Sequence, residues 1–173
     1  MKKCITTIVT LVLTAGFASA VSLPEGTKEI QFSGSLDLDS ADGTVIDFNL
    51  GYGVFVVDQV EVGVRGNIYD SDSATRWGLG AFSEYNWIME TAWVPYAGLA
   101  LDYQDSDVNI GAGTTDNALQ VGGRVGVKYF LTEGLAIDSA YVFNWATEDI
   151  YLEDQSVSDT ESLFAFGLRY YFQ

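Results

Sequence analysis

The chain has 173 residues with 24 acidic and 8 basic side chains, which give a net charge of −16, and it contains no histidine. This charge makes nucleic acid and anionic surfaces poor partners, because like charges repel. The lack of histidine removes the commonest acid–base catalyst and a frequent metal ligand, so we expect no enzyme, no cofactor and no metal site.

Residues 1–20 are predicted to be a secretory signal peptide. Lys2 and Lys3 precede an apolar run that starts at Ile5, and the segment ends in the small residues 18–20. A basic start, a short apolar middle and an Ala-x-Ala ending are typical of a cleaved export signal. The run is shorter than the roughly 20 residues that a membrane-spanning helix needs. Cleavage after Ala20 would remove Cys4, the single cysteine, so the remaining domain, 21–173, would be stabilised without disulfides.

The domain contains eight segments in which apolar residues alternate with polar or small ones. Such a period of two predicts β-strands. The segments cover approximately residues 29–40, 44–55, 60–68, 77–85, 93–103, 119–129, 135–145 and 163–173. The fifth segment is the least regular because it contains Pro95, and a proline removes a donor from a strand ladder. No later apolar run has the length of a spanning helix, so a membrane crossing must use strands.

The connections between these segments alternate in length. We expect short turns at residues 56–59, 86–92 and 131–134, and long acidic loops at 104–117 and 146–159. Brief connections at 39–43 and 70–74 fall on the side of the long loops. Short turns at one end and longer loops at the other are typical of outer-membrane barrels.

Charge and volume are distributed unequally between the two faces of the strands. The face with the charged residues also carries nine glycines: Gly51, Gly53, Gly63, Gly78, Gly80, Gly98, Gly122, Gly126 and Gly167. A soluble core would hold large side chains and exclude lone charges, whereas the lumen of a narrow barrel needs room for long polar side chains. Aromatic residues gather near both ends of the apolar face, as in interfacial girdles. The apolar face is therefore predicted to face lipid.

The closing segment has a large apolar residue at every second position: Phe164, Phe166, Leu168, Tyr170 and Phe172. On this terminal pattern and on its architecture, the domain resembles the eight-stranded outer-membrane β-barrels of Gram-negative bacteria, of the OmpA and OmpX type. The resemblance implies an all-β fold, an antiparallel up-and-down transmembrane barrel in the bacterial outer membrane. It also implies a monomer in contact with outer-membrane lipid and lipopolysaccharide, whose closing segment is the signal read by the barrel-assembly machinery. The family usually ends on its aromatic residue, whereas this chain adds Gln173.

The candidate site is a set of charged residues on the inner face: Glu61, Arg65, Glu84, Arg124, Lys128, Asp138 and Arg169. Antiparallel pairing is expected to set Glu61 beside Glu84, and Asp138 between Lys128 and Arg169. Asp47 and Asp102 are further inward acids, whereas Lys28 and Arg76 are not assigned to the lumen. Neighbouring carboxylates in a dry interior require cations. We interpret the set either as a polar plug that keeps the barrel rigid or as a gate whose ion pairs exchange partners to open a water path. The resemblance to OmpA-type barrels implies an interior charge cluster of this kind.

These features favour a non-catalytic outer-membrane barrel that contributes to envelope integrity, with low, gated passage of ions or small solutes left open. One alternative is a surface adhesin or interaction protein that acts through the acidic external loops. Another is a soluble secreted β-barrel that binds an apolar ligand. The acidic loops lack the ligand spacing of an EF-hand. They are interpreted as solvated, with weak divalent-cation bridging to lipopolysaccharide as the alternative.

Overall fold

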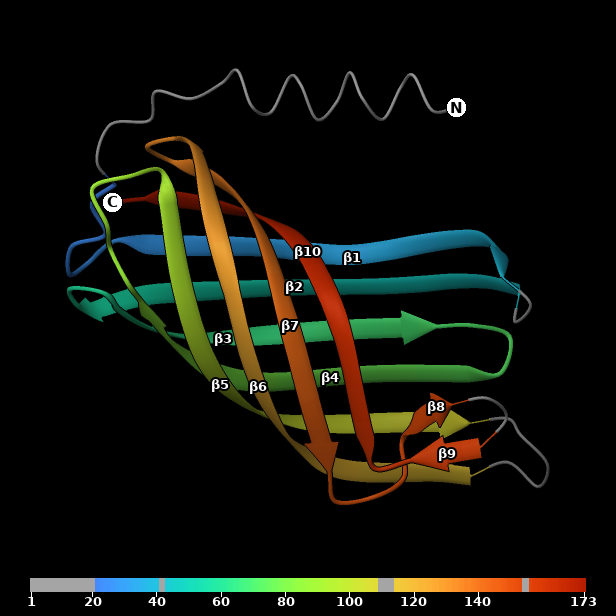
Figure 1. Ribbon diagram of the computed structural model, residues 1–173. Helices are drawn as coiled ribbons and strands as arrows, with labels where there is room; N and C mark the ends of the chain where they lie inside the picture. Colours follow the sequence, from blue (N-terminus) through green and yellow to red (C-terminus); the bar gives the residue numbers. More distant parts are fainter. Residues whose placement is uncertain (1–20, 41–42, 109–113, 154–155) are drawn as a thin grey trace.

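Eight long antiparallel strands close into a barrel in the order β1-β10-β7-β6-β5-β4-β3-β2 (Figure 1). The structure, a computed structural model, describes residues 21–40, 43–108, 114–153 and 156–173, so the predicted signal peptide lies outside the described residues. The barrel strands are β1 (Lys28–Ser40), β2 (Gly43–Val57), β3 (Val60–Asp70), β4 (Ala74–Asn86), β5 (Trp93–Val108), β6 (Thr114–Thr132), β7 (Leu135–Ala146) and β10 (Thr160–Phe172). The predicted fold class, an eight-stranded up-and-down barrel, is confirmed.

The barrel closes through its first and last strands. The ladder runs from the pair Lys28 and Phe172 to the pair Ser33 and Gly167, so residues 28–33 of β1 and 167–172 of β10 close the sheet. We call the end of the barrel with the connections 58–59, 87–92 and 133–134 the turn end. The start of β1 and the end of β10 also lie at the turn end (Figure 1). The opposite end, where β7 is joined to β10, is called the loop end.

The two long loops are more ordered than the sequence predicted. β5 and β6 continue their ladder as far as the pair Val108 and Thr114, so most of the expected loop 104–117 is strand. The connection after β7 contains a small hairpin of β8 (Tyr151–Glu153) and β9 (Ser156–Ser158). Alternation of apolar residues reports only that one face is buried or in lipid. Where paired strands extend into water, their hydrogen bonds continue but the alternation of apolar residues stops.

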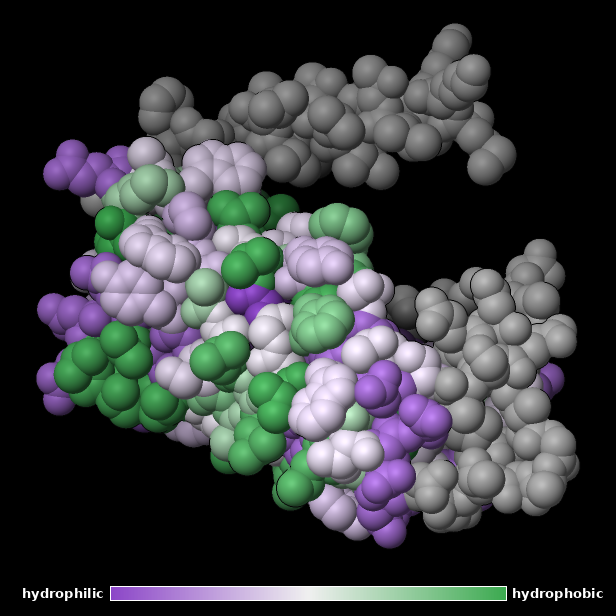
Figure 2. All heavy atoms as spheres, turned by 60° about the horizontal axis from the view of Figure 1, so that its bottom comes forward, coloured by the Kyte–Doolittle hydropathy of each residue, from purple (hydrophilic) through white to green (hydrophobic). Residues whose placement is uncertain are grey.

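The outer surface of the barrel is apolar and the interior is polar, as predicted. Leu99 is 69% exposed and Phe164 is 72% exposed, whereas the charged residues Lys128 and Arg169 are 0% exposed. Figure 2 shows apolar and aromatic side chains across the middle of one face, with hydrophilic side chains toward its two ends. A soluble barrel with an apolar core would have the reverse arrangement. None of the described residues forms a helix long and apolar enough to cross a membrane.

Aromatic residues on the outer face pair at both ends of the barrel. At the turn end the rings of Trp93 and Tyr129 lie 4.5 Å apart, and at the loop end those of Trp77 and Tyr103 lie 6.2 Å apart. Amphipathic rings favour the two membrane–water interfaces. Their positions agree with the predicted girdles and place the apolar band between them.

Candidate functional site

An apolar stopper closes the lumen at the turn end. It consists of the buried residues Leu23, Phe55, Val94, Phe130, Ala136 and Tyr171. Leu23 comes from the segment that precedes β1, which is fastened to β2 by hydrogen bonds from Gly26 N to Phe55 O and from Phe55 N to Thr27 O, both 2.8 Å long. Tyr171 packs against Phe130 with ring centroids 5.0 Å apart. Burial of these side chains from six separate segments stabilises the closed end.

A cluster of buried charges lies next to the stopper, and Arg169 is its centre. The Nη1 atom of Arg169 is 2.7 Å from Glu29 Oε1 and 2.8 Å from Glu84 Oε2, and its Nη2 atom is 3.3 Å from Asp138 Oδ2. Glu29 on β1, Glu84 on β4 and Arg169 on β10 therefore meet across the lumen. Charge-assisted bonds of this length offset much of the large desolvation cost of burying the ions.

Lys128 is the second fully buried cation of the cluster. Its Nζ atom is 3.1 Å from Glu84, 3.2 Å from Glu29 and 3.7 Å from Glu61. Glu61 is fully buried, and neither of its carboxylate oxygens has a hydrogen-bond partner in the described part of the chain. Glu61 is thus the most weakly paired acid of the cluster.

Tyr96 on β5 contacts three cations of the cluster through its ring. The charged groups of Arg169, Lys128 and Arg124 lie 4.8, 4.9 and 5.4 Å from the centroid of this ring. Its hydroxyl donates a hydrogen bond of 2.7 Å to Asp138 Oδ2 and accepts bonds from the guanidinium groups of Arg169 and Arg124. A cation over an aromatic face is stabilised further when water is excluded. One ring therefore orders three cations and one carboxylate.

The predicted charge set is only partly brought together. Glu61 faces Glu84 directly in the β3–β4 ladder, as expected, and Lys128 faces Asp138 in the β6–β7 ladder. The ion pairs of Lys128 are nevertheless with glutamates, and Asp138 pairs with Arg124 and Arg169. The strand register determines which residues are opposite each other in a ladder. Long charged side chains can also reach across the lumen, so their ion pairs form with residues of other strands.

Two predicted details of the charge set differ from the structure. Asp138 stands opposite Gly167 rather than Arg169 in the ladder, although the Arg169 guanidinium still reaches it. Arg65 pairs with Asp102 nearer the loop end, with its Nε atom 2.7 Å from Oδ1, so it stands apart from the cluster.

Arg76 lies inside the lumen, contrary to the prediction. It contacts Glu161 at 3.6 Å and lines the cavity described below. Its position follows the alternation of β4, in which Gly78 and Gly80 also face inward, so the sequence contained the necessary signal. Glu29 and Tyr96 are functional residues that the prediction missed. Glu29 shares a face with Gln31, and Tyr96 shares one with Gly98 and Asp102, so the same alternation pointed to both residues, although Pro95 made the start of that segment the least regular.

The lumen glycines provide the space that the charged side chains occupy. A Cβ atom on Gly98 would lie 2.8 Å from Glu84 Cγ, and one on Gly167 would lie 2.7 Å from Asp138 Oδ1. A Cβ atom on Gly53 would overlap the Glu61 carboxylate. Each of the nine predicted glycines has an atom closer than 3.0 Å to such a Cβ position, from a charged or amide side chain at most of them and from the Phe82 ring at Gly63 and the Tyr96 ring at Gly126. Large polar side chains and glycines therefore fill the lumen together.

Replacing Gly126 with leucine is expected to lower the free energy of unfolding by about 1–3 kcal/mol, the usual cost of overpacking. Its Cβ atom would lie 2.8 Å from Ala140 Cβ and 2.9 Å from the Tyr96 ring, neither of which can easily move. Gly123→Leu is the matched control on the same strand, because its Cβ atom would point outward with nothing within 4 Å. Urea titration of the refolded protein would compare them. Equal losses in both variants would contradict the assignment of the two faces.

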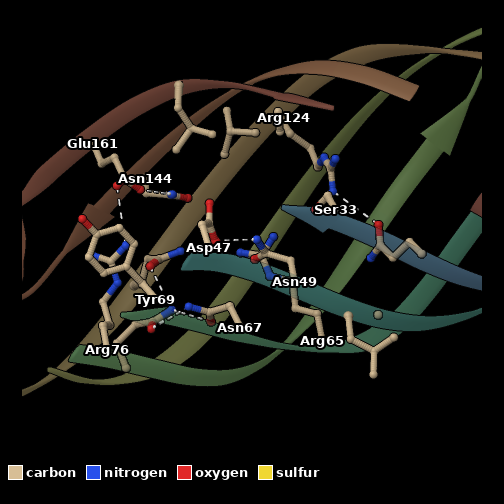
Figure 3. A pocket seen from close by; sticks show the side chains of 18 residues that line it. Ser33, Asp47, Asn49, Arg65, Asn67, Tyr69, Arg76, Arg124, Asn144 and Glu161 are labelled. Carbon is tan, nitrogen blue, oxygen red and sulfur yellow. Dashed lines mark hydrogen bonds and ion pairs between the residues drawn. The ribbon is translucent and has the colours of Figure 1, made fainter. Parts of the chain in front are cut away.

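A polar cavity of about 130 Å³ lies between the charge cluster and the loop end (Figure 3). Six amide side chains line it: Gln31, Asn49, Asn67, Gln104, Gln120 and Asn144. Arg76 and Glu161 stand at one end of the cavity in Figure 3, and Arg124 stands away from them. Such a lining suits water and small polar solutes. Among the described residues, no group of acidic residues is arranged to hold a metal ion.

Three solved structures resemble the barrel. The N-terminal β-barrel domain of OprF from Pseudomonas aeruginosa has a TM-score of 0.63 and 17% identity, over 86% of this chain and 98% of that one. Neisserial surface protein A has a TM-score of 0.58 and 19% identity, over 84% of this chain and 94% of that one. The attachment invasion locus protein Ail of Yersinia pestis has a TM-score of 0.53 and 14% identity, over 86% and 99%. No family model and no curated protein matches the sequence. At these identities the likeness establishes the fold alone.

Proposed function

This chain has the fold of an eight-stranded outer-membrane β-barrel. We propose that it is a non-catalytic structural barrel of the bacterial outer membrane. In this proposal the interior charges form a plug that keeps the barrel rigid, and the protein contributes to the integrity of the envelope. The observation that carries the proposal is the complete burial of Lys128 and Arg169 among carboxylates, directly beside the apolar stopper.

The plug is favoured over a gate because the buried cations have several partners at once. Arg169 contacts Glu29, Glu84 and Asp138, and Lys128 contacts three glutamates, so loss of one ion pair leaves the others in place. An opening would also have to displace the apolar stopper, which includes Tyr171. The two layers together oppose a continuous water path.

The outer surface supports the proposed location. Leu99 and Phe166 are among the most exposed large apolar residues of the described barrel, and an apolar band of this kind is stable in contact with lipid. In the proposal, outer-membrane lipid and lipopolysaccharide cover this band, and the barrel-assembly machinery reads the closing strand β10 during assembly. Closure of the sheet supports a monomer, since no barrel strand is left without a partner.

Planar-bilayer recordings test the plug against the gate. We expect the reconstituted protein to show no conductance above that of the protein-free bilayer. Arg124→Ala and Arg169→Ala are expected to stay silent as well, because the stopper remains. Lys28→Ala is the control, since Lys28 lies outside the cluster, over the Phe172 ring at 5.9 Å. Discrete conductance steps in the wild type, or in either lumen variant but not in the control, would show a gate instead.

A further inference from the structure

The connection between β7 and β10 returns to the mouth of the barrel at the loop end. Ile150 and Tyr151 are each only 2% exposed, and they pack with Ala118 and Ala146. The residues before them, 147–149, are exposed. Two large side chains that directly follow three exposed residues are therefore buried in the barrel mouth.

Contacts from three barrel strands hold this pair. The Tyr151 hydroxyl donates a hydrogen bond of 2.7 Å to Gln120 Oε1 on β6. The Ile150 carbonyl oxygen accepts bonds from Arg76 Nη1 on β4 at 3.3 Å and from Ser106 Oγ on β5 at 3.5 Å. Burial raises the pKa of the Tyr151 phenol, and the nearby Glu161 charge raises it further, so the hydroxyl stays protonated and able to donate.

The guanidinium group of Arg76 packs against the Tyr151 ring. Its guanidinium carbon is 4.7 Å from the centroid of the Tyr151 ring and 5.2 Å from that of Tyr69. The same guanidinium contacts Glu161 at 3.6 Å, at the start of β10. A stacked arginine between two rings is a specific arrangement, because it requires both rings to be in place.

The pair covers one side of the mouth and leaves the other side more open. On β5, Ser106, which contacts Ile150, is 1% exposed and Gln104 is 2% exposed, whereas Ser33 and Asn49 on the β1–β2 side are half-buried. Figure 3 shows Ser33 and Asn49 on the wall of the cavity. Solvent access to the lumen thus differs between the two sides.

The pair can leave without breaking the barrel. In the described sheets, the backbone of β8, which begins at Tyr151, forms a ladder with β9 and with no barrel strand. A few side-chain contacts therefore hold it, and segments held in this way open more easily than ladders do.

From these contacts we infer that Ile150 and Tyr151 form a removable wedge that closes the β4–β6 side of the loop-end mouth. With the wedge seated, the polar wall of Gln104, Ser106 and Gln120 is hidden. With the wedge released, that wall and the Arg76 guanidinium face the outside, and the cavity becomes a wider vestibule that ends at the charge cluster. The inference is independent of whether the cluster is a plug or a gate.

Cysteine accessibility tests the wedge. In a chain with Cys4→Ser, which removes the single native cysteine, Ser106→Cys would report the covered wall and Ser33→Cys the open one. The probe is a membrane-impermeant methanethiosulfonate reagent with a trimethylammonium group, added to the protein folded in vesicles. We expect the thiol introduced at position 106 to react at least tenfold more slowly than the thiol introduced at position 33. Tyr151→Ala should remove most of this difference by accelerating the reaction at position 106 alone.

Asp149→Ala is the matched control, because Asp149 is an exposed neighbour in the same connection. It should leave both rates unchanged. Heat-modifiable gel mobility would verify that each variant is folded. Equal reactivity of the two introduced thiols in chains that keep Tyr151 would overturn the inference. So would an unchanged ratio of rates after Tyr151→Ala in a folded barrel.

Discussion

Arg169→Ala is expected to lower the free energy of unfolding by about 3–5 kcal/mol, the usual cost of removing one partner from a buried ion cluster. The substitution leaves Glu29, Glu84 and Asp138 buried without the cation that contacts all three. Lys128 still contacts Glu29 and Glu84, and Arg124 still contacts Glu84 and Asp138. Only two cations are then left for four buried acids, because Lys128 also contacts Glu61. Urea titration of the protein folded in micelles, followed by heat-modifiable gel mobility, would measure the loss.

Two companion variants show whether the loss comes from the cluster. Lys28→Ala removes a positive charge outside the lumen and should change the free energy of unfolding by no more than about 0.5 kcal/mol. Glu84→Gln combined with Arg169→Ala should cost less than the sum of the two single variants, because it also removes a stranded negative charge. A loss for Arg169→Ala of only about 1 kcal/mol, typical of an exposed ion pair, would contradict a dry cluster.

Leu99→Arg is expected to destabilise the barrel in phospholipid vesicles by about 2–4 kcal/mol, the cost of a basic residue on the lipid face near the bilayer midplane. Leu99 is 69% exposed and lies near the middle of β5, opposite Ser83 on β4 and Gly123 on β6. Denaturant titration of vesicle-bound protein, followed by tryptophan fluorescence, would measure the effect.

The control for Leu99→Arg is Asp72→Arg in the exposed connection between β3 and β4. Outside the apolar band, the same side chain stays in water and should cost no more than about 0.5 kcal/mol. In a soluble barrel, Leu99 would face water and both variants would be equally mild. Equal stability of the two variants in vesicles would therefore contradict a lipid-facing surface.

Much of the lumen could be predicted because short turns determine the register of neighbouring strands. The brief connection after β3 was enough to set Glu61 opposite Glu84. The same reasoning failed for Arg169, which stands two residues from the expected position opposite Asp138, because the connection from β7 to β10 is long. A long connection leaves the register undetermined, and in this barrel a hairpin and the Tyr151 wedge occupy that connection.

The sequence by itself determined the strands, their two faces and the sorting of glycine and charge to the interior. These are consequences of a period of two along a single strand, so no distant contact is needed to infer them. Only the tertiary structure decided which charges meet. Glu29, Glu84 and Arg169 lie on three strands that are brought together by closure and curvature of the sheet. The seating of Tyr151 beside Arg76 likewise depends on a chain reversal in a connection without alternation. Contacts across a lumen are set by the geometry of the whole barrel, which no local pattern records.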